Sequence, residues 1–328
     1  MTELNEIIVL LSGFEGISRK FVLPGIIRKL REESYKGDSP HSLGEDSAAI
    51  GTTSDEMILL TTDAIVEELC LYHPRAAGFN VVLANVMDIY AAGGTPTSFA
   101  VALSYSDQTI GDQIMDGIIE GSHTFMIPIV RGHTNPQSES TYVVGSATGT
   151  VKKAEMLTAG GAQAGDKLVL LFDTKGKRGS SYKLGWDTVT HRESSEVVSR
   201  LTVMNELAES GIVNASKDVS VAGLVGTAGM MVEYSGKGGI IDLDSVEKHR
   251  PSIIDFKDWI RMFISLGFLV SASPDKVERI SNIAEQHSMS AVVIGMVDSS
   301  SSLRLKLGKE ESILFDFSQG PVLTPSSG

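Results

Sequence analysis

The stretch Gly44–Ile50, GEDSAAI, places two neighbouring carboxylates in a frame of small residues. Shortly after it comes MILLTTDAIV, residues 57–66, an apolar and β-branched run that predicts a buried strand with Asp63 at the end of its apolar part. Acidic residues beside such a strand are either solvated turn residues or ligands for a cation. The rest of the sequence has to decide between the two.

Composition limits both the fold and the partners. The chain has 328 residues, which exceeds one ordinary hydrophobic core and predicts two domains. Its 42% apolar and 21% charged residues are typical of a folded globular protein. The formal charge of −13 argues against nucleic acid as a partner, because phosphate neutralisation requires clustered Lys and Arg. An anionic substrate must then be met by local basic groups, backbone N–H groups or metal ions.

Cysteine content and the length of apolar runs exclude further classes of protein. Cys70 is the only cysteine, which excludes a disulfide framework and a thiolate zinc cluster. The first residues lack a cleavable signal pattern, and no apolar run approaches the roughly 20 residues that span a bilayer. We therefore expect a cytoplasmic protein with no membrane partner.

Helical and extended patterns alternate on both sides of a Gly- and Lys-containing break at 152–165. This alternation predicts two α+β domains, residues 1–155 and 156–328. The polar tail at 318–328 is predicted to be disordered.

No glycine-rich phosphate loop is visible, because the chain has neither a Walker A pattern nor a GxGxxG fingerprint after a strand. Dispersed carboxylates that hold Mg²⁺ are another device, and Asp46, Asp63 and Asp88 lie at predicted strand or helix edges. Asp88 lies in an otherwise apolar helix over 74–92, where a carboxylate is costly to bury unless it is paired or liganded. Asn85 shares a helical face with it at i, i+3. Taken singly, each Asp is more often a cap or a turn residue.

The order of the motifs carries more information than any single residue. GEDSAAI is followed by TTD at 61–63, by the Asn85-x-x-Asp88 helix with AAGGTP, by RGHT at 131–134 and by KDVSVAGL at 217–224. This series resembles the AIR synthase-like (PurM-like) superfamily over nearly the whole chain. The superfamily includes aminoimidazole ribonucleotide synthetase, thiamin-monophosphate kinase, selenophosphate synthetase and a hydrogenase-maturation protein. The sequence around KDVSVAGL is most similar to uncharacterised AIR-synthase-related proteins of the methanogenesis-marker type.

The resemblance implies a fold and a set of ligands. It implies an N-terminal domain whose sheet closes a β-barrel with its dimer mate, and a C-terminal α+β domain of the AIR synthase-like type. It further implies that ATP lies between the domains, with Mg²⁺ between its phosphates and the carboxylates. The expected protein is a homodimer whose domain 1–155 binds ATP and Mg²⁺ and forms the dimer.

The resemblance also implies roles for individual residues, motif by motif. Asp46, Asp63 and Asp88 correspond to metal ligands. Glu45 varies in type in the superfamily and is expected to be a supporting or solvated neighbour. The residues that correspond to nucleotide-binding positions are Thr62, Asp63, Asn85, Thr134, Asp218 and Ser220.

Two residues are candidate catalytic groups that face the transferring phosphate. His133 stands where much of the superfamily has an acid, and the form with His resembles selenophosphate synthetase; the side chain is either a phosphate donor or an ordinary loop histidine. Lys20, in GFEGISRKF, is either a phosphate contact or a solvated side chain. The same loop lacks the Cys or selenocysteine of selenophosphate synthetase, which argues against selenide chemistry.

Other departures narrow the choice of reaction. Val221-Ala222 follows Ser220 where thiamin-monophosphate kinase has Asp-Gly, and the C-terminal TPSSG lacks the reactive cysteine of the hydrogenase-maturation protein. Both differences argue against those activities. A basic loop, Lys175–Lys183, is either a clamp for an anionic substrate or a surface loop, and the role of residues 173–195 stays open.

We therefore predict a Mg²⁺- and ATP-dependent enzyme, a phosphotransferase or ligase, that activates or phosphorylates an oxygen of a small-molecule substrate. Two alternatives remain. One is a non-catalytic or maturation-partner relative that keeps the dimer and nucleotide binding; the other is a selenophosphate synthetase-like activity without the N-terminal thiol. The sequence leaves open the acceptor substrate, the product ADP or AMP, and the nucleophile or base.

Overall fold

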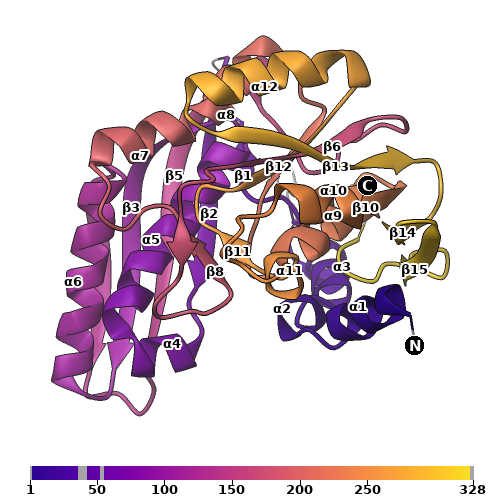
Figure 1. The fold of residues 1–328 in the computed structure, drawn as a ribbon. Coiled ribbons are helices and arrows are strands. Elements are labelled where there is room, and N and C mark those ends of the chain that lie inside the picture. Colours follow the sequence, from indigo (N-terminus) through magenta and orange to yellow (C-terminus); the bar gives the residue numbers. More distant parts are fainter. Residues whose placement is uncertain (1, 36–42, 52–54, 326–328) are drawn as a thin grey trace.

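Two β-sheets with helices packed against them make up the protein, as the computed structural model in Figure 1 shows for residues 2–35, 43–51 and 55–325. The first sheet has five strands in the order β1-β2-β5-β3-β4. Neighbouring strands are antiparallel except β3 and β4, which run parallel. The strands are β1 Ala48–Ile50, β2 Glu56–Ala64, β3 Thr95–Tyr105, β4 Ile129–Pro136 and β5 Tyr142–Lys152.

Three helices accompany this sheet: α4 Glu67–Tyr72, α5 Pro74–Ala91 and α6 Gln108–Thr124. α5 begins at a proline, whose missing N–H costs nothing in the first helical turn. Glycines bring α5 and α6 close together, because a Cβ on Gly78 would lie only 1.9 Å from the carbonyl oxygen of Ile114. α5 is buried on most of its sides, so any functional side chain on it has a fixed position.

The strand period of two separates the two faces of this sheet. On β2 the odd-numbered Leu59 and Thr61 are buried, whereas the even-numbered Ile58 and Leu60 are 39% and 37% exposed. The edge strand β4 is exposed along its length. Closure of this open face by a dimer mate stays a prediction.

The second sheet has seven strands in the order β15-β14-β10-β13-β6-β12-β9, and a separate three-stranded sheet has the order β11-β8-β7. The strands are β6 Lys167–Phe172, β7 Lys177–Arg178, β8 Gly185–Asp187, β9 Ala215–Asp218, β10 Gly238–Asp242, β11 Phe263–Ile264, β12 Phe268–Ala272, β13 Ser290–Asp298, β14 Ser302–Leu307 and β15 Glu310–Asp316. The helices of this half are α7 Ser194–Leu201, α8 Val203–Ser210, α9 Gly223–Tyr234, α10 Leu243–His249, α11 Phe256–Trp259 and α12 Val277–Gln286, with short 3₁₀ turns at Lys153–Glu155 and Pro274–Lys276.

The first helices of the chain pack with the second sheet, not the first. They are α1 Glu3–Ser12, α2 Glu15–Ser18 and α3 Leu23–Glu33; α1 contacts β14 and β15, and α2 contacts α9. Leu4, Ile7 and Leu11 are buried in the core of that sheet. The predicted α+β fold is confirmed. The boundary near residue 155 stays a prediction, and α1 and α2 reach the second sheet from the other side of it.

The predicted disorder of the C-terminal tail is wrong for residues 318–325. Leu323 is buried, and the carboxylate of Glu233 accepts the backbone N–H groups of Val322, Leu323 and Thr324. A buried carboxylate that collects several amide donors fixes a polar segment that has little core of its own. Residues 326–328 lie outside the described part. Among the helices of the described part, none is long and apolar enough to cross a membrane.

Candidate functional site

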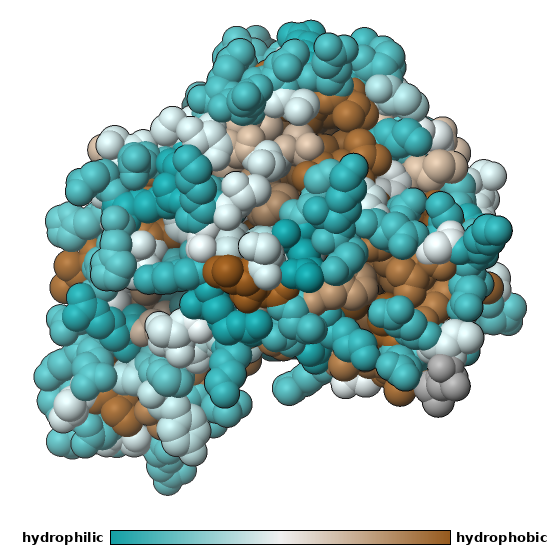
Figure 2. Space-filling model, in the orientation of Figure 1, coloured by the Kyte–Doolittle hydropathy of each residue, from teal (hydrophilic) through white to brown (hydrophobic). Residues whose placement is uncertain are grey.

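A cleft of about 1200 Å³ lies where the two sheets meet. Its lining includes Asp46, Asp63 and Asp88 from the first half of the chain and Lys217 and Asp218 from the second. In Figure 2 the surface is hollowed between the part that carries α4 and the part that carries α1 and α2, and hydrophilic residues line much of its rim. The cleft is therefore polar and charged, unlike the apolar pockets that usually hold drug-sized ligands.

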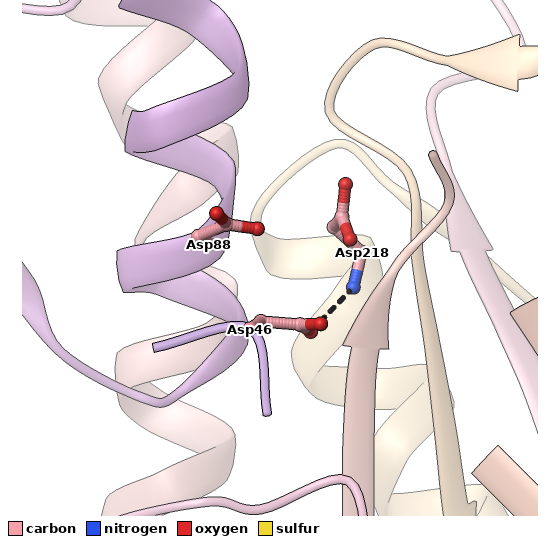
Figure 3. A group of neighbouring side chains, drawn as sticks. All are labelled: Asp46, Asp88 and Asp218. Atoms are coloured by element: carbon pink, nitrogen blue, oxygen red, sulfur yellow. Dashed lines mark hydrogen bonds between the residues drawn. The ribbon is translucent and has the colours of Figure 1, made fainter. Parts of the chain in front are cut away.

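Three carboxylates from distant parts of the chain meet in this cleft (Figure 3). Asp46 precedes β1, Asp88 lies on α5 and Asp218 ends β9, and one oxygen from each lies within 4.8 Å of the others. The backbone N–H of Asp218 donates to Oδ2 of Asp46 at 3.3 Å. Such a group of hard oxygen atoms is suited to a divalent cation.

Strand β2 adds two more groups on the face that points toward α5. The hydroxyl of Thr61 donates to Oδ2 of Asp88. Oδ2 of Asp63 is buried and has no hydrogen-bond partner among the described residues. Thr62, which alternates to the opposite face, instead hydrogen-bonds Ser146 of β5 at 2.9 Å. An orphaned buried carboxylate oxygen is costly unless a cation or a proton meets it.

Burial and mutual repulsion shift the acidity of this cluster. The pKa of Asp88 lies well above its ordinary value, first because the group is buried and then because Asp63, Asp218 and Asp46 are close. Burial, followed by repulsion from Asp46, raises the pKa of Asp218 to about 7, although Lys217 opposes that rise. The negative charge of these carboxylates is thus not balanced by nearby positive charge, and a divalent cation would balance it.

Two lysines supply part of that charge. Lys217 is buried and forms an ion pair with Asp46 through its ammonium group. Burial alone would lower the pKa of Lys217, but Asp46 and Asp218 raise it above its ordinary value overall. For Lys20 burial dominates and lowers the pKa, with repulsion from Lys217 second, while Asp218 and Asp63 oppose both. Both lysines line the cleft.

The donor set fits Mg²⁺. Among the described residues, the ligand atoms that the cluster offers are carboxylate oxygens, without sulfur or imidazole nitrogen, and such oxygens are the ligands that Mg²⁺ prefers. The orphaned oxygen of Asp63 and the raised pKa values of Asp88 and Asp218 both indicate uncompensated negative charge. These observations point to a hard cation rather than to a structural carboxylate cluster.

The residues predicted from the sequence divide into two groups. Those that line the cleft are Lys20, Asp46, Thr62, Asp63, Asp88, Asp218 and Ser220. The remaining three, Asn85, His133 and Thr134, are not part of this lining. Their predicted roles stay predictions.

Asn85 points into the core of the first half. Its amide donates to the carbonyl oxygen of Val81, and a Cβ on Gly145 of β5 would lie 2.8 Å from its nitrogen. Its Oδ1 is buried without a hydrogen-bond partner in the described part of the chain. Asn85 thus contacts the underside of the sheet, whereas Asp88, one turn later, reaches the cleft.

His133 and Thr134 are exposed on the edge strand β4. His133 pairs with Ala102, Ala102 with Val144, and Val144 with Ala64 of β2. Three strand spacings of about 4.8 Å place His133 roughly 14 Å from β2 across the sheet. Within one chain these two residues and the carboxylate cluster are therefore separate.

Some residues of the site did not stand out in the sequence. The motif predicts Thr62 as the nucleotide-binding residue, but the strand period places Thr61 and not Thr62 on the face of Asp63. Lys217 precedes Asp218 directly, and its burial was not visible in the motif. Glu45 is fixed by contacts outside the cluster: its carboxylate accepts the backbone N–H of Ala159 at 2.7 Å and a hydrogen bond from Tyr234.

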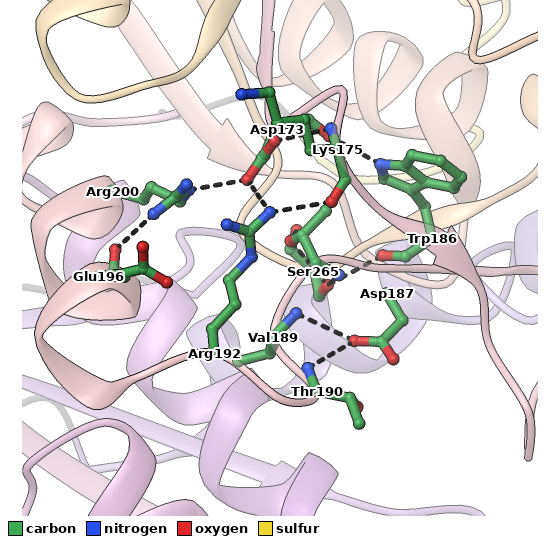
Figure 4. A network of polar contacts seen from close by, with 11 residues as sticks. Asp173, Lys175, Trp186, Asp187, Val189, Thr190, Arg192, Glu196, Arg200 and Ser265 are labelled. Atoms are coloured by element: carbon green, nitrogen blue, oxygen red, sulfur yellow. Dashed lines mark hydrogen bonds and ion pairs between the residues drawn. The ribbon is translucent and has the colours of Figure 1, made fainter.

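The loop after β6 lines one side of the cleft. A network of polar contacts at its base holds it in place (Figure 4). Asp173 is buried at its base, and its Oδ2 accepts from Arg192 at 2.6 Å and from Arg200 at 2.7 Å. Trp186 donates its indole N–H to the carbonyl oxygen of Asp173 at 2.8 Å. The loop presents residues 179–182 to the cleft.

The basic residues of this loop are engaged elsewhere. Arg178 pairs with Asp258 at 2.8 Å, and Lys177 lies 3.9 Å from Asp187. Lys175 and Lys183 are not part of the lining of the cleft. The wall therefore offers hydroxyl groups, from Ser180, Ser181 and Tyr182, more than positive charge.

Comparison with known proteins identifies both halves of the chain. The model of the AIR synthase related protein, N-terminal domain, matches residues 44–151, and that of the C-terminal domain matches residues 163–308. An uncharacterised protein of Methanocaldococcus jannaschii is 31% identical over 96% of this chain and 97% of its own length. An uncharacterised protein of Synechocystis sp. is 32% identical over 97% and 98%.

Solved structures share the fold at lower identity. T. maritima PurL complexed with ADP has a TM-score of 0.73 at 17% identity, and covers 94% of this chain, which spans about half (52%) of that protein. AaThiL complexed with AMPPCP and TMP has a TM-score of 0.64 at 18% identity, over 89% of this chain and 95% of that one. These similarities agree with the two-sheet architecture described above.

Proposed function

This chain belongs to the AIR synthase related protein family, and from that premise we propose that it is a Mg²⁺-dependent enzyme that uses ATP to phosphorylate or otherwise activate an oxygen of a small substrate. The observation that carries the proposal is the carboxylate cluster of Asp46, Asp88 and Asp218, with the orphaned oxygen of Asp63 beside it, in a cleft between the two sheets. T. maritima PurL is complexed with ADP and AaThiL with AMPPCP in their solved structures, which supports a nucleotide here.

The residues of the cleft would have distinct roles in binding the metal ion and the nucleotide. Asp46, Asp63, Asp88 and Asp218 would hold Mg²⁺, and the bound cation would neutralise the triphosphate and polarise its phosphoryl oxygens. Thr61 fixes the rotamer of Asp88 through its hydrogen bond. Lys20, which lines the same cleft, would contact a phosphate as a point charge, and Ser220 and Thr62 would lie near the nucleotide.

The cleft excludes bulk water only in part, and its far wall is the loop that carries Ser180, Ser181 and Tyr182. We propose that the acceptor substrate binds between this wall and the carboxylates, because the wall supplies neutral hydrogen-bond donors and the carboxylates anchor the nucleotide. Phosphoryl transfer depends mainly on positioning and charge stabilisation, which this arrangement would supply.

A homodimer is part of the proposal. The open face of the first sheet exposes Ile58 and Leu60, and the edge strand β4 is exposed along its length. An apolar sheet face and an edge strand of this kind are stabilised when another chain covers them. The mass in solution of the wild type and of Ile58→Glu, measured by light scattering, tests this; a monomeric wild type contradicts it.

Nucleotide binding tests the main proposal. ATP with Mg²⁺ is expected to bind in calorimetry and to raise the melting temperature of the wild type. Asp63→Asn is expected to weaken the binding at least tenfold, because it removes the charge of a ligand. Asp275→Asn, on the exposed Asp275 of the second half, serves as the matched control. The proposal fails if the wild type does not bind ATP with Mg²⁺, or if Asp63→Asn binds as well as the control.

Turnover separates the enzyme from a non-catalytic relative. Release of ADP or AMP is measured with a panel of small acceptors that carry hydroxyl, carboxylate or amide oxygens. Stimulation by one class identifies the acceptor. Binding of the nucleotide without release in the presence of any acceptor favours the non-catalytic alternative.

A further inference from the structure

We propose that Lys217 is a built-in cation of this centre and that Asp46 is its counter-ion, so that the centre takes one divalent cation through Asp63, Asp88 and Asp218. The inference rests on the proposed function, because it concerns the same cleft. It changes the role of Asp46 from a metal ligand to a positioning residue, and it fixes the number of metal ions.

The contacts of Asp46 separate it from the other acids. Its Oδ1 accepts the ammonium group of Lys217, and its Oδ2 accepts the backbone N–H of Asp218 at 3.3 Å. Both oxygens of this carboxylate thus have a donor within the protein. A carboxylate that is compensated in this way gains less from a metal ion than one that is not.

The other three carboxylates are not compensated by positive charge. Oδ2 of Asp63 is buried without a partner in the described residues. Asp88 accepts the neutral hydroxyl of Thr61, and its other polar neighbours, Asp63, Asp218 and Asp46, are acids that raise its pKa. The carboxylate of Asp218 accepts no hydrogen bond from the part of the chain that the structure describes, and Asp46 and Asp63 repel it. These are the oxygen atoms that require a cation.

Lys217 cannot easily move aside for a second metal ion. It lies on β9, the edge strand of the second sheet, where it pairs with Leu269 of β12, and its side chain is only 7% exposed because α5 and α9 also pack against β9. An ammonium group drawn out of such a place would leave its own charge or that of Asp46 unpaired. A divalent ion on Asp46 would also lie within a few ångströms of the ammonium charge, and the two would repel.

The number of bound ions tests this directly. Mn²⁺ is used as the probe, since the signal of free Mn²⁺ in electron paramagnetic resonance counts the bound ions on the full chain without nucleotide. The wild type is expected to bind one ion. Lys217→Met, which nearly keeps the length of the side chain and removes the charge, is expected to bind a second ion because Asp46 then has no positive partner.

The double variant Asp46→Asn with Lys217→Met keeps the test decisive if Lys217→Met does not fold. It removes the ion pair as a whole, so the charge of the cleft is unchanged. It is expected to bind one Mn²⁺ with an affinity within about threefold of the wild type. A loss of tenfold or more, with an intact fold by circular dichroism, shows that Asp46 is a metal ligand and overturns the inference.

The failure of the inference is distinct from the failure of the proposed function. A wild type that binds two ions overturns the assignment of Lys217 and leaves the Mg²⁺- and ATP-dependent function standing. A wild type that binds no ion without nucleotide also overturns the inference, whereas the proposed function fails only if ATP with Mg²⁺ does not bind.

Discussion

The buried charges at the base of the cleft wall give the sharpest prediction on stability. Asp173 is 1% exposed and holds Arg192 and Arg200, of which Arg200 is itself only 8% exposed. Asp173→Asn keeps the shape of the side chain but leaves two guanidinium groups without their counter-charge. When one partner of a buried ion pair is removed, the cost is about 3–5 kcal/mol, mainly because the other charge stays buried.

That cost predicts a large shift in thermal unfolding. For a unit of the size of the second half of this chain, about 2–4 °C of melting temperature corresponds to 1 kcal/mol, so Asp173→Asn is expected to melt roughly 6–20 °C below the wild type. Differential scanning calorimetry measures the shift, and urea unfolding gives the free energy independently.

The matched control is Asp275→Asn, which makes the same chemical change on an exposed side chain and is expected to leave the melting temperature nearly unchanged. A melting temperature of Asp173→Asn within about 2 °C of the wild type would refute the reasoning, because the two arginines would then be solvated without loss. Because the loop forms a wall of the cleft, a weaker affinity for the proposed acceptor is expected alongside the loss of stability.

Three further predictions concern packing, the tail and pH. Gly78→Ala is expected to lower the free energy of unfolding by about 1–3 kcal/mol or more, because its Cβ would lie 1.9 Å from a backbone oxygen of α6. Gly25→Ala on α3, whose Cβ would meet nothing within 4 Å, is expected to raise it by about 0.5–1 kcal/mol. Urea unfolding of both variants measures the two changes. Glu233→Gln is expected to cost about 1–3 kcal/mol, since one of the acceptors for three buried backbone N–H groups is lost, and limited proteolysis is expected to cut the tail faster. The pKa of Asp218 is raised to about 7 in the folded protein, so without metal this group lowers stability as pH rises from the pKa of an unfolded Asp toward 7. The rise in melting temperature that Mg²⁺ causes is therefore expected to be larger at about pH 8 than at about pH 6. An equal rise at both pH values contradicts this prediction.

Part of the site was accessible from the sequence because local pattern and motif order fix it. An acid at the end of an apolar strand, such as Asp63, and an acid inside an apolar helix, such as Asp88, are costly without a partner, and the structure brings both to one cleft with Asp46 and Asp218. The α+β class followed from the alternation of helical and extended patterns. These features depend on residues within one element, which a single sequence displays.

The rest depends on which face of an element packs against which neighbour. Asn85 and Asp88 are one turn apart, yet the first contacts the sheet and only the second reaches the cleft. Lys217 resembles a surface lysine in the sequence, and its burial arises because β12, α5 and α9 pack around the edge strand β9. The tail was predicted to be disordered because its polar composition does not reveal the contact with Glu233, which is nearly 90 residues away in sequence. Tertiary packing decides such contacts, and no local pattern encodes them.

The placement of the acids also explains how a cluster of like charges persists without a metal. Asp63 and Asp88 belong to the first sheet and its helix, whereas Asp218 belongs to the second sheet, so repulsion among them acts to separate the two halves. One continuous apolar core opposes that repulsion, because it includes Leu59 and Phe99 of the first sheet together with Val169 and Phe268 of the second. Burial of such large side chains contributes about 1.5–3 kcal/mol each, which exceeds the repulsion of partly protonated carboxylates. Loss of the cation is therefore expected to raise the pKa values of the acids and leave the two halves together, so that the cleft stays formed for the nucleotide and its metal to enter.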